Sequence, residues 1–127
     1  MDGLKRLVLL VQAAFYVVTG LWPLVSLSSF EAVTGPKADH WLVQTVGLLI
    51  VAIGVSLLVG VWRSHPSRET LVLSLLSATM LAGVDVVFVS LRVIPPIYLL
   101  DAAIEGLIIV ALIALSRVRP RVVTHPA

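Results

Sequence analysis

Four long apolar stretches constrain the fold of this chain more than any other feature. They are Leu7–Leu27, Trp41–Trp62, Leu71–Leu91 and Ile97–Leu115, each 19–22 residues long. A helix of about 20 apolar residues crosses the hydrocarbon core of a bilayer. In lipid every backbone N–H and C=O group needs an internal partner, so stretches of this length must be helical. The sequence therefore predicts four transmembrane helices.

The composition agrees with this prediction and removes several classes of function. Hydrophobic residues make up 59% of the chain and charged residues 13%, against about 25% charged in an ordinary globular domain. The chain has no cysteine, which excludes disulfides, thiolate metal sites and cysteine nucleophiles. The net charge is only +2, and the basic residues lie at the ends of the apolar stretches. We therefore expect no nucleic-acid partner, because no continuous basic patch is present.

The connections between the stretches are short, which favours antiparallel neighbours. Gly35-Pro36 indicates a turn in the first connection (28–40), Ser67 is a candidate N-cap, and Pro95-Pro96 suits the opening of a helix. We predict an all-α, up-down-up-down antiparallel four-helix bundle that forms a single transmembrane domain over residues 1–127. Its expected helices are 5–28, 40–62, 69–92 and 96–116, followed by a short basic C-terminal tail, 117–127.

The basic residues predict an orientation in the membrane. One side is expected to carry Lys5, Arg6, Arg63, Arg68, Arg117, Arg119 and Arg121, and the other only Lys37 and Arg92. The positive-inside rule then places both termini of this multi-pass protein in the cytoplasm, in a cell (inner or plasma) membrane. The first stretch is longer than the 7–15 residues usual for the apolar core of a signal peptide, so we expect it to be retained. The lipid bilayer is the first predicted partner.

Each expected helix has one face of small or polar residues at helical spacing. These faces are Gln12, Tyr16, Thr19 and Pro23; Thr45, Ala52, Ser56 and Gly60; Ser74, Ala78, Ala82, Asp85 and Arg92; and Tyr98, Asp101 and Glu105. Small residues let helix backbones approach closely, and hydroxyls form hydrogen bonds between helices. We therefore expect these faces to point inward.

Three acids interrupt the apolar stretches, and no basic residue accompanies them there. A carboxylate at the centre of a membrane helix costs roughly 2.5–3.5 kcal/mol on insertion scales. At a rise of 1.5 Å per residue, Asp101 lies roughly 6 Å, Asp85 roughly 9 Å and Glu105 roughly 12 Å from the outer ends of their stretches. All three therefore belong to the outer half. Because neighbouring carboxylates repel one another, we expect at least one to be protonated at neutral pH, or a cation to lie among them.

The candidate site is an outer-facing acidic pocket. Asp85 and Glu105 would form its titrating pair and Asp101 its mouth, and the hydrogen-bonding walls would comprise Tyr16, Thr19 and Thr45, with Tyr98 beside them. Two simpler interpretations stay open. Asp85 would be a buried carboxyl hydrogen-bonded to a neighbouring helix through Tyr16 or Gln44, and Asp101 a wetted first-turn acid favoured by the helix dipole.

No catalytic residue, metal site or cofactor is assigned. His40, His65 and His125 belong to separate loops or to the tail, on both sides of the predicted membrane, so they are not expected to converge. The chain has no phosphate-binding loop and no glycine-rich dinucleotide motif. An oxygen-only site for a hard cation, built from the three acids, is compatible with the residue types.

The segment from Val84 to Glu105 includes Asp85, the Pro95-Pro96 turn and Tyr98-Leu99-Leu100-Asp101. With this segment and four short-looped apolar stretches, the chain resembles small bacterial four-helix membrane proteins of DoxX-like architecture. The resemblance implies a four-helix membrane fold and no established activity.

Three functional hypotheses follow. The leading one is that the acidic pocket binds a small cationic or lipophilic ligand, or relays protons. The second is a structural or interaction protein that forms a homo-oligomer or accompanies a membrane-protein partner. The third is a lipid-modifying enzyme that uses a carboxyl pair, one protonated and one not. We expect binding or relay rather than catalysis.

Overall fold

The computed structural model describes residues 2–63 and 66–117, which form five helices and no strand. Four helices are long, namely α1 (Asp2–Val25), α3 (His40–Val61), α4 (Arg68–Ser90) and α5 (Tyr98–Arg117). Each is long and apolar enough to cross a membrane. The fifth, α2 (Leu27–Thr34), has eight residues. The prediction of an all-α four-helix bundle is confirmed, whereas residues 118–127 of the predicted tail, and His65, lie outside the described residues.

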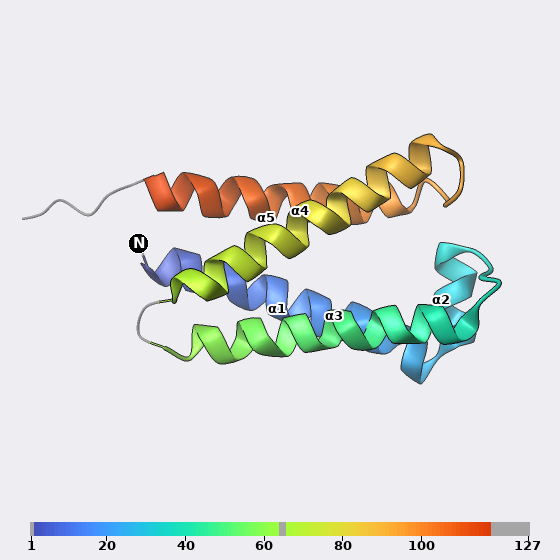
Figure 1. Cartoon of the computed structure of the whole chain (residues 1–127), viewed down its shortest axis with the longest axis horizontal. Helices are drawn as coiled ribbons and strands as arrows, with labels where there is room; N and C mark the ends of the chain where they lie inside the picture. Colours follow the sequence, from blue (N-terminus) through green and yellow to red (C-terminus); the bar gives the residue numbers. More distant parts are fainter. Residues whose placement is uncertain (1, 64–65, 118–127) are drawn as a thin grey trace, which may run out of the picture.

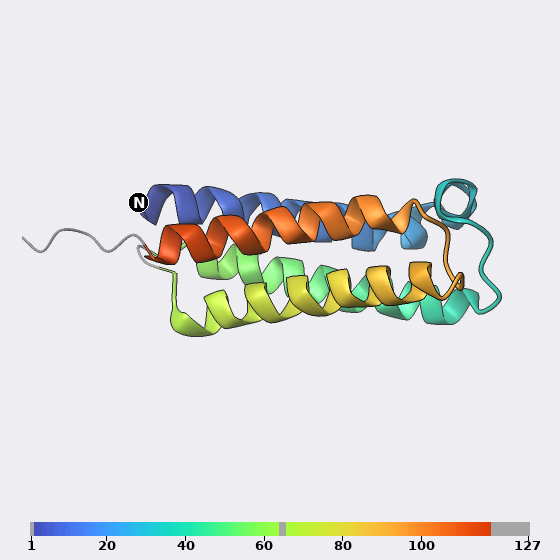
Figure 2. The same cartoon turned by 90° about the horizontal axis from the view of Figure 1, so that it is seen from above.

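Consecutive long helices run antiparallel (Figure 1). α1 packs most closely against α3, and α4 against α5, while α1–α5 and α3–α4, the pairs that overlap in Figure 2, are the looser ones. The N-terminus and the last turn of α5 lie at one end of the bundle, called here the terminal end. The connection from α4 to α5 lies beside α2 at the opposite end, called here the α2 end.

Glycines bring α1 and α3 together. A Cβ atom added at Gly20 would lie 2.6 Å from the carbonyl oxygen of Gly47, and one added at Gly54 would lie 2.9 Å from Val17 Cγ2. Gly47 and Gly54 are both buried. Small residues are what allow membrane helices to approach this closely, so the glycine face of α3 is the one that points inward.

Of the inward face predicted for this helix only Gly60 is buried, and the prediction is wrong for the other three residues. Thr45, Ala52 and Ser56 lie on the exposed side of α3. Thr45 Oγ1 donates to the carbonyl of Trp41 and Ser56 Oγ to that of Ala52, each at 2.8 Å. Hydroxyls that bond the carbonyl four residues earlier need no partner on another helix, and they leave the glycines to set the packing.

The first connection contains structure that was not predicted. Pro23 lies in the last turn of α1, which ends at Val25 rather than at residue 28. The chain leaves the helix at Ser26 and continues as α2. A pair between Glu31 Oε1 and His40 Nε2, 2.8 Å apart, links α2 to the start of α3.

Lys37 contacts two helices at the same end of the bundle. Its ammonium group donates to the carbonyls of Thr34 at 2.9 Å and Gly35 at 2.8 Å, beyond the last turn of α2. It also lies 5.3 Å from the ring centroid of Tyr98, at the start of α5. Cations near the face of an aromatic ring are attracted to it, so Lys37 connects α2 to α5.

Both ends of α4 have defined caps. The predicted N-cap is confirmed, because Ser67 Oγ accepts a hydrogen bond from the backbone N–H of Thr70 at 3.2 Å. Beyond the C-terminus Arg92 has a φ of 60°, and the N–H of Val93 reaches the carbonyl of Phe88 at 2.9 Å. This left-handed termination usually employs glycine.

Candidate functional site

The interior of the bundle contains a buried polar network in addition to its apolar core. Its members come from three helices, and each is at most 8% exposed: Gln12 and Tyr16 on α1, Ser74, Ser77 and Asp85 on α4, and Glu105 on α5. Buried polar groups are normally hydrogen-bonded, so any member without a partner requires a physical explanation.

Glu105 is the centre of this network. It is completely buried, and the hydroxyl of Tyr16 donates to its Oε2 atom at 2.8 Å. The other carboxyl oxygen, Oε1, has no hydrogen-bond partner. The helical stripes predicted from the sequence thus bring Tyr16 and Glu105 into contact, and they leave one Glu105 oxygen without a donor.

Asp85 and Asp101 complete a carboxyl cluster, defined here as Asp85, Asp101 and Glu105. The carboxyls of Asp85 and Asp101 are close enough to interact with each other, and Glu105 is near enough to interact electrostatically with both. Asp85 is 5% exposed and its Oδ2 atom also lacks a partner. Asp101 is only half-buried and forms the more accessible edge of the cluster.

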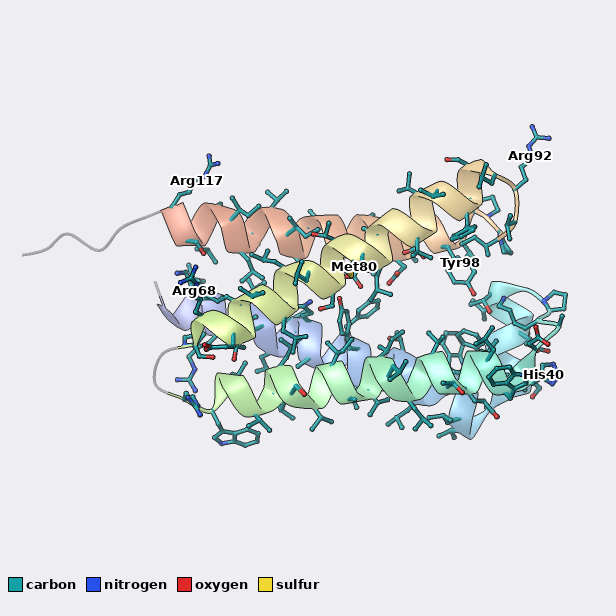
Figure 3. The ribbon with its side chains drawn as sticks, viewed as in Figure 1. His40, Arg68, Met80, Arg92, Tyr98 and Arg117 are labelled. Atoms are coloured by element: carbon teal, nitrogen blue, oxygen red, sulfur yellow. The ribbon has the colours of Figure 1, made fainter. Side chains whose placement is uncertain are left out.

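Among residues 2–63 and 66–117 no basic side chain forms an ion pair with the cluster. The one acid–base contact at ion-pair distance in these ranges joins Glu31 and His40, at the α2 end. Arg92 and Tyr98 lie at that end, and Arg68 and Arg117 at the other (Figure 3). Tyr16 donates to Glu105 rather than to Asp85, so Tyr16 does not provide the simple hydrogen-bonded partner considered for Asp85.

A buried amide continues the network from Tyr16 toward the terminal end. The Nε2 atom of Gln12 donates to the hydroxyl of Tyr16 and to the backbone carbonyl of Ser74, both at 3.1 Å. The hydroxyl of Ser74 donates back to Gln12 Oε1. The sequence pattern placed Gln12 and Ser74 on polar faces but gave them no role in the site. The feature that could have indicated a role for Gln12 was its four-residue spacing from Tyr16, which puts both side chains on one face of the helix.

Three further residues of the predicted site have their observed contacts elsewhere. Thr45 is exposed, and Thr19 is half-buried with its hydroxyl donating to the carbonyl of Phe15 at 2.7 Å. Tyr98 is half-buried, and its ring faces Lys37. The network therefore uses serine hydroxyls and the Gln12 amide where the sequence suggested threonine walls.

Two shallow, open hollows of the surface are lined by residues outside the carboxyl cluster. One of about 380 Å³ is lined by Val89, Arg92, Val93, Ile94, Pro95 and Pro96. A second, of about 510 Å³, is lined by Arg68, Glu69, Val72, Leu73 and Leu76. Within the described part of the chain, no three His, Asp or Glu side chains are grouped to hold a metal ion. The chemistry that this cluster offers is the binding and exchange of a proton or a small cation by carboxyl oxygens.

In comparisons with known proteins, no family model, no curated protein and no solved structure significantly matches this chain. The resemblance to DoxX-like proteins therefore stays a prediction, and the functional argument depends on the site alone.

Proposed function

We propose that this chain is a multi-pass protein of the cell membrane that binds and exchanges protons at its carboxyl cluster. Four candidate membrane-spanning helices support the membrane assignment. The excess of Lys and Arg at the terminal end supports a cytoplasmic position for both termini. In this orientation the cluster belongs to the outer half of the membrane.

One observation carries the proposal. Glu105 and Asp85 are buried acids, each with an oxygen that has no partner, and Asp101 lies beside Asp85. Removing an unpaired carboxylate from water is so costly that the group takes up a proton or a cation instead. Two neighbouring carboxylates repel each other unless a proton or a cation lies between them.

A proton fits this cluster better than a larger ligand. The two hollows described above are lined by other residues, so a lipophilic molecule bound in either of them would not contact Glu105 or Asp85. A proton needs only the Glu105 and Asp85 oxygens that have no hydrogen-bond partner. Half-buried Asp101 gives the proton a route to the α2 end. A monovalent cation is the closest competitor, and it predicts a dependence on the salt that is absent for a proton.

The test is infrared spectroscopy of the protein in lipid nanodiscs across a pH series. Protonated carboxyls have a C=O stretch that is separate from those of amides and carboxylates, and the band shifts in D₂O. We expect a band that disappears as pH rises, that is lost in Glu105→Gln and that is altered in Asp85→Asn. The matched control is Glu69→Gln, an exposed acid in the first turn of α4 at the terminal end, which should leave the band intact.

Two results would reject proton binding. The first is a spectrum without any titrating carboxyl band that depends on Glu105. The second is a band whose titration moves with the sodium or potassium concentration at constant ionic strength, because the cluster would then bind the metal cation.

A second candidate function, helix-mediated association, is favoured by the exposed side of α3. Thr45, Ala52 and Ser56 present small and hydroxyl groups to the surroundings of the bundle, and membrane helices associate through such residues. Crosslinking in native membranes tests it. Ser56→Leu should reduce a crosslinked dimer or partner adduct, and a chain that remains monomeric at all crosslinker concentrations would contradict this candidate.

A further inference from the structure

The hydrogen bonds around Gln12 have a direction that the structure determines. The backbone carbonyl of Ser74 is only an acceptor, so the amide atom facing it must be the nitrogen. The same nitrogen then faces the hydroxyl of Tyr16 and donates to it. The hydroxyl of Ser74 consequently donates to the amide oxygen. Both protons of the buried Gln12 amide are in use.

This direction determines which oxygen of Glu105 exchanges protons. Because Tyr16 accepts from Gln12, its single proton is directed to Glu105 Oε2. Oε2 therefore acts as an acceptor, and a proton that binds Glu105 occupies Oε1, the atom without a partner. Gln12 is a positioning residue in this scheme, since it acts on Glu105 only through Tyr16.

An apolar plug closes the terminal side of the network. It consists of Leu9, Val61, Ile108 and Leu112, each at most 7% exposed, with Ile104 packed against it. Leu9 precedes Gln12 by one helical turn, and Ile108 and Leu112 follow Glu105 by one and two turns toward the terminal end. A proton that moves in that direction meets an amide nitrogen without a free lone pair and then a dry hydrocarbon layer.

The titratable groups that face Glu105 are few. They are Tyr16 on α1, Asp85 on α4 and Asp101 on α5 itself. α3 carries no ionisable side chain beyond its first residue, His40, at the α2 end. Both acidic neighbours, Asp85 and Asp101, therefore lie on the α2 side of Glu105.

From this arrangement we infer that the carboxyl cluster is accessible from one side only. Protons reach Glu105 Oε1 from the α2 end by way of Asp101 and Asp85, and the Gln12 amide with the plug blocks exchange with the terminal end. The inference rests on the proposed proton-binding function and deepens it, because the protein would bind protons from one compartment without conducting them across the membrane.

Oriented vesicles provide the test. The chain has no cysteine, so a single Ala38→Cys substitution in the exposed link before α3 reports orientation through an impermeant thiol reagent. Phosphatidylcholine vesicles carrying the protein in either orientation receive a rapid change of external pH while the carboxyl band is recorded. We expect the band to respond promptly when the α2 end faces the bath, and at least about tenfold more slowly when the terminal end does.

The plug can be opened selectively. Leu112→Ser places a hydroxyl in the buried plug, whereas Ile113→Ser makes the same change at the adjacent position, which is 41% exposed. We expect Leu112→Ser to accelerate the response from the terminal end by about tenfold and Ile113→Ser to leave it unchanged. If Leu112→Ser does not fold, the comparison of the two orientations of the unsubstituted chain decides the question.

The outcomes separate the two proposals. Equal responses in both orientations, or proton leakage into vesicles well above that of protein-free vesicles, would overturn one-sided access and leave proton binding intact. Absence of any Glu105-dependent band in either orientation would overturn both.

Discussion

Substituting Tyr16 by phenylalanine removes one oxygen atom from the centre of the polar network and keeps the aromatic ring in the core. The hydroxyl donates to Glu105 Oε2 at 2.8 Å and accepts from Gln12 at 3.1 Å. Tyr16 is 1% exposed and Glu105 is fully buried, so bulk water does not replace the lost donor. Both oxygens of Glu105 would then be without a partner.

The expected cost follows from these contacts. Hydrogen bonds between membrane helices contribute about 0.6 kcal/mol on average and up to about 1.7. A buried acceptor that loses its donor costs about 1–3 kcal/mol. We therefore expect Tyr16→Phe to lower the free energy of unfolding by about 1–2 kcal/mol. Reversible unfolding in mixed detergent micelles, with increasing sodium dodecyl sulfate, measures this change.

The chain supplies its own control, because it has only one other tyrosine. Tyr98→Phe removes the same atom but retains the ring that faces Lys37, and it should change stability by less than about 0.5 kcal/mol. A double-mutant cycle of Tyr16→Phe with Glu105→Gln should give a coupling energy of at least about 0.5 kcal/mol. A coupling energy indistinguishable from zero would show that the Tyr16–Glu105 bond does not stabilise the fold.

Two further predictions concern the packing and termination of the helices. Gly47→Ala should destabilise the bundle by about 1–3 kcal/mol in the same assay, because the new Cβ would lie 2.5 Å from the carbonyl oxygen of Gly20. Gly83→Ala is its control, since no atom lies within 4 Å of the added Cβ; equal losses for the two variants would contradict glycine-mediated packing. Arg92→Gly should raise stability by roughly 1 kcal/mol, since a left-handed conformation disfavours residues with a Cβ; a loss of stability would indicate that the arginine side chain contributes more than its backbone costs.

Hydropathy was sufficient to predict the long helices because their length is imposed by the bilayer. The predicted ranges 40–62 and 69–92 differ by no more than two residues at each end from α3 (His40–Val61) and α4 (Arg68–Ser90). The missed element was α2. It contains Ser28, Ser29, Glu31 and Thr34 and lies almost entirely within the segment 28–40 that hydropathy assigned to a connection. A hydropathy count does not distinguish a short polar helix from a loop.

Helical periodicity predicted the acidic part of the site better than its hydroxyl part. A carboxyl in an apolar helix has strong reasons to point inward, and Asp85 and Glu105 do so. A threonine hydroxyl satisfies itself on its own helix, as Thr19 and Thr45 show, so its polarity carries little information about direction. On α3 the inward face is set by Gly47 and Gly54, because glycine has no side chain and lets α1 approach closely.

The carboxyl cluster has many more hydrogen-bond acceptors than donors directed at it, and this imbalance is the link between the fold and the proposed function. Asp85, Asp101 and Glu105 bring six carboxyl oxygens together, and Tyr16 is the one side-chain donor from another helix that the described structure directs at them. The Ser74 hydroxyl donates to Gln12, and the Gln12 amide donates to Tyr16 and to the backbone carbonyl of Ser74. Ser77 donates to backbone carbonyls. Helix packing alone would be satisfied by apolar residues at Asp85 and Glu105. The proposed uptake of protons from the α2 end would relieve this shortage of hydrogen-bond donors at a buried site.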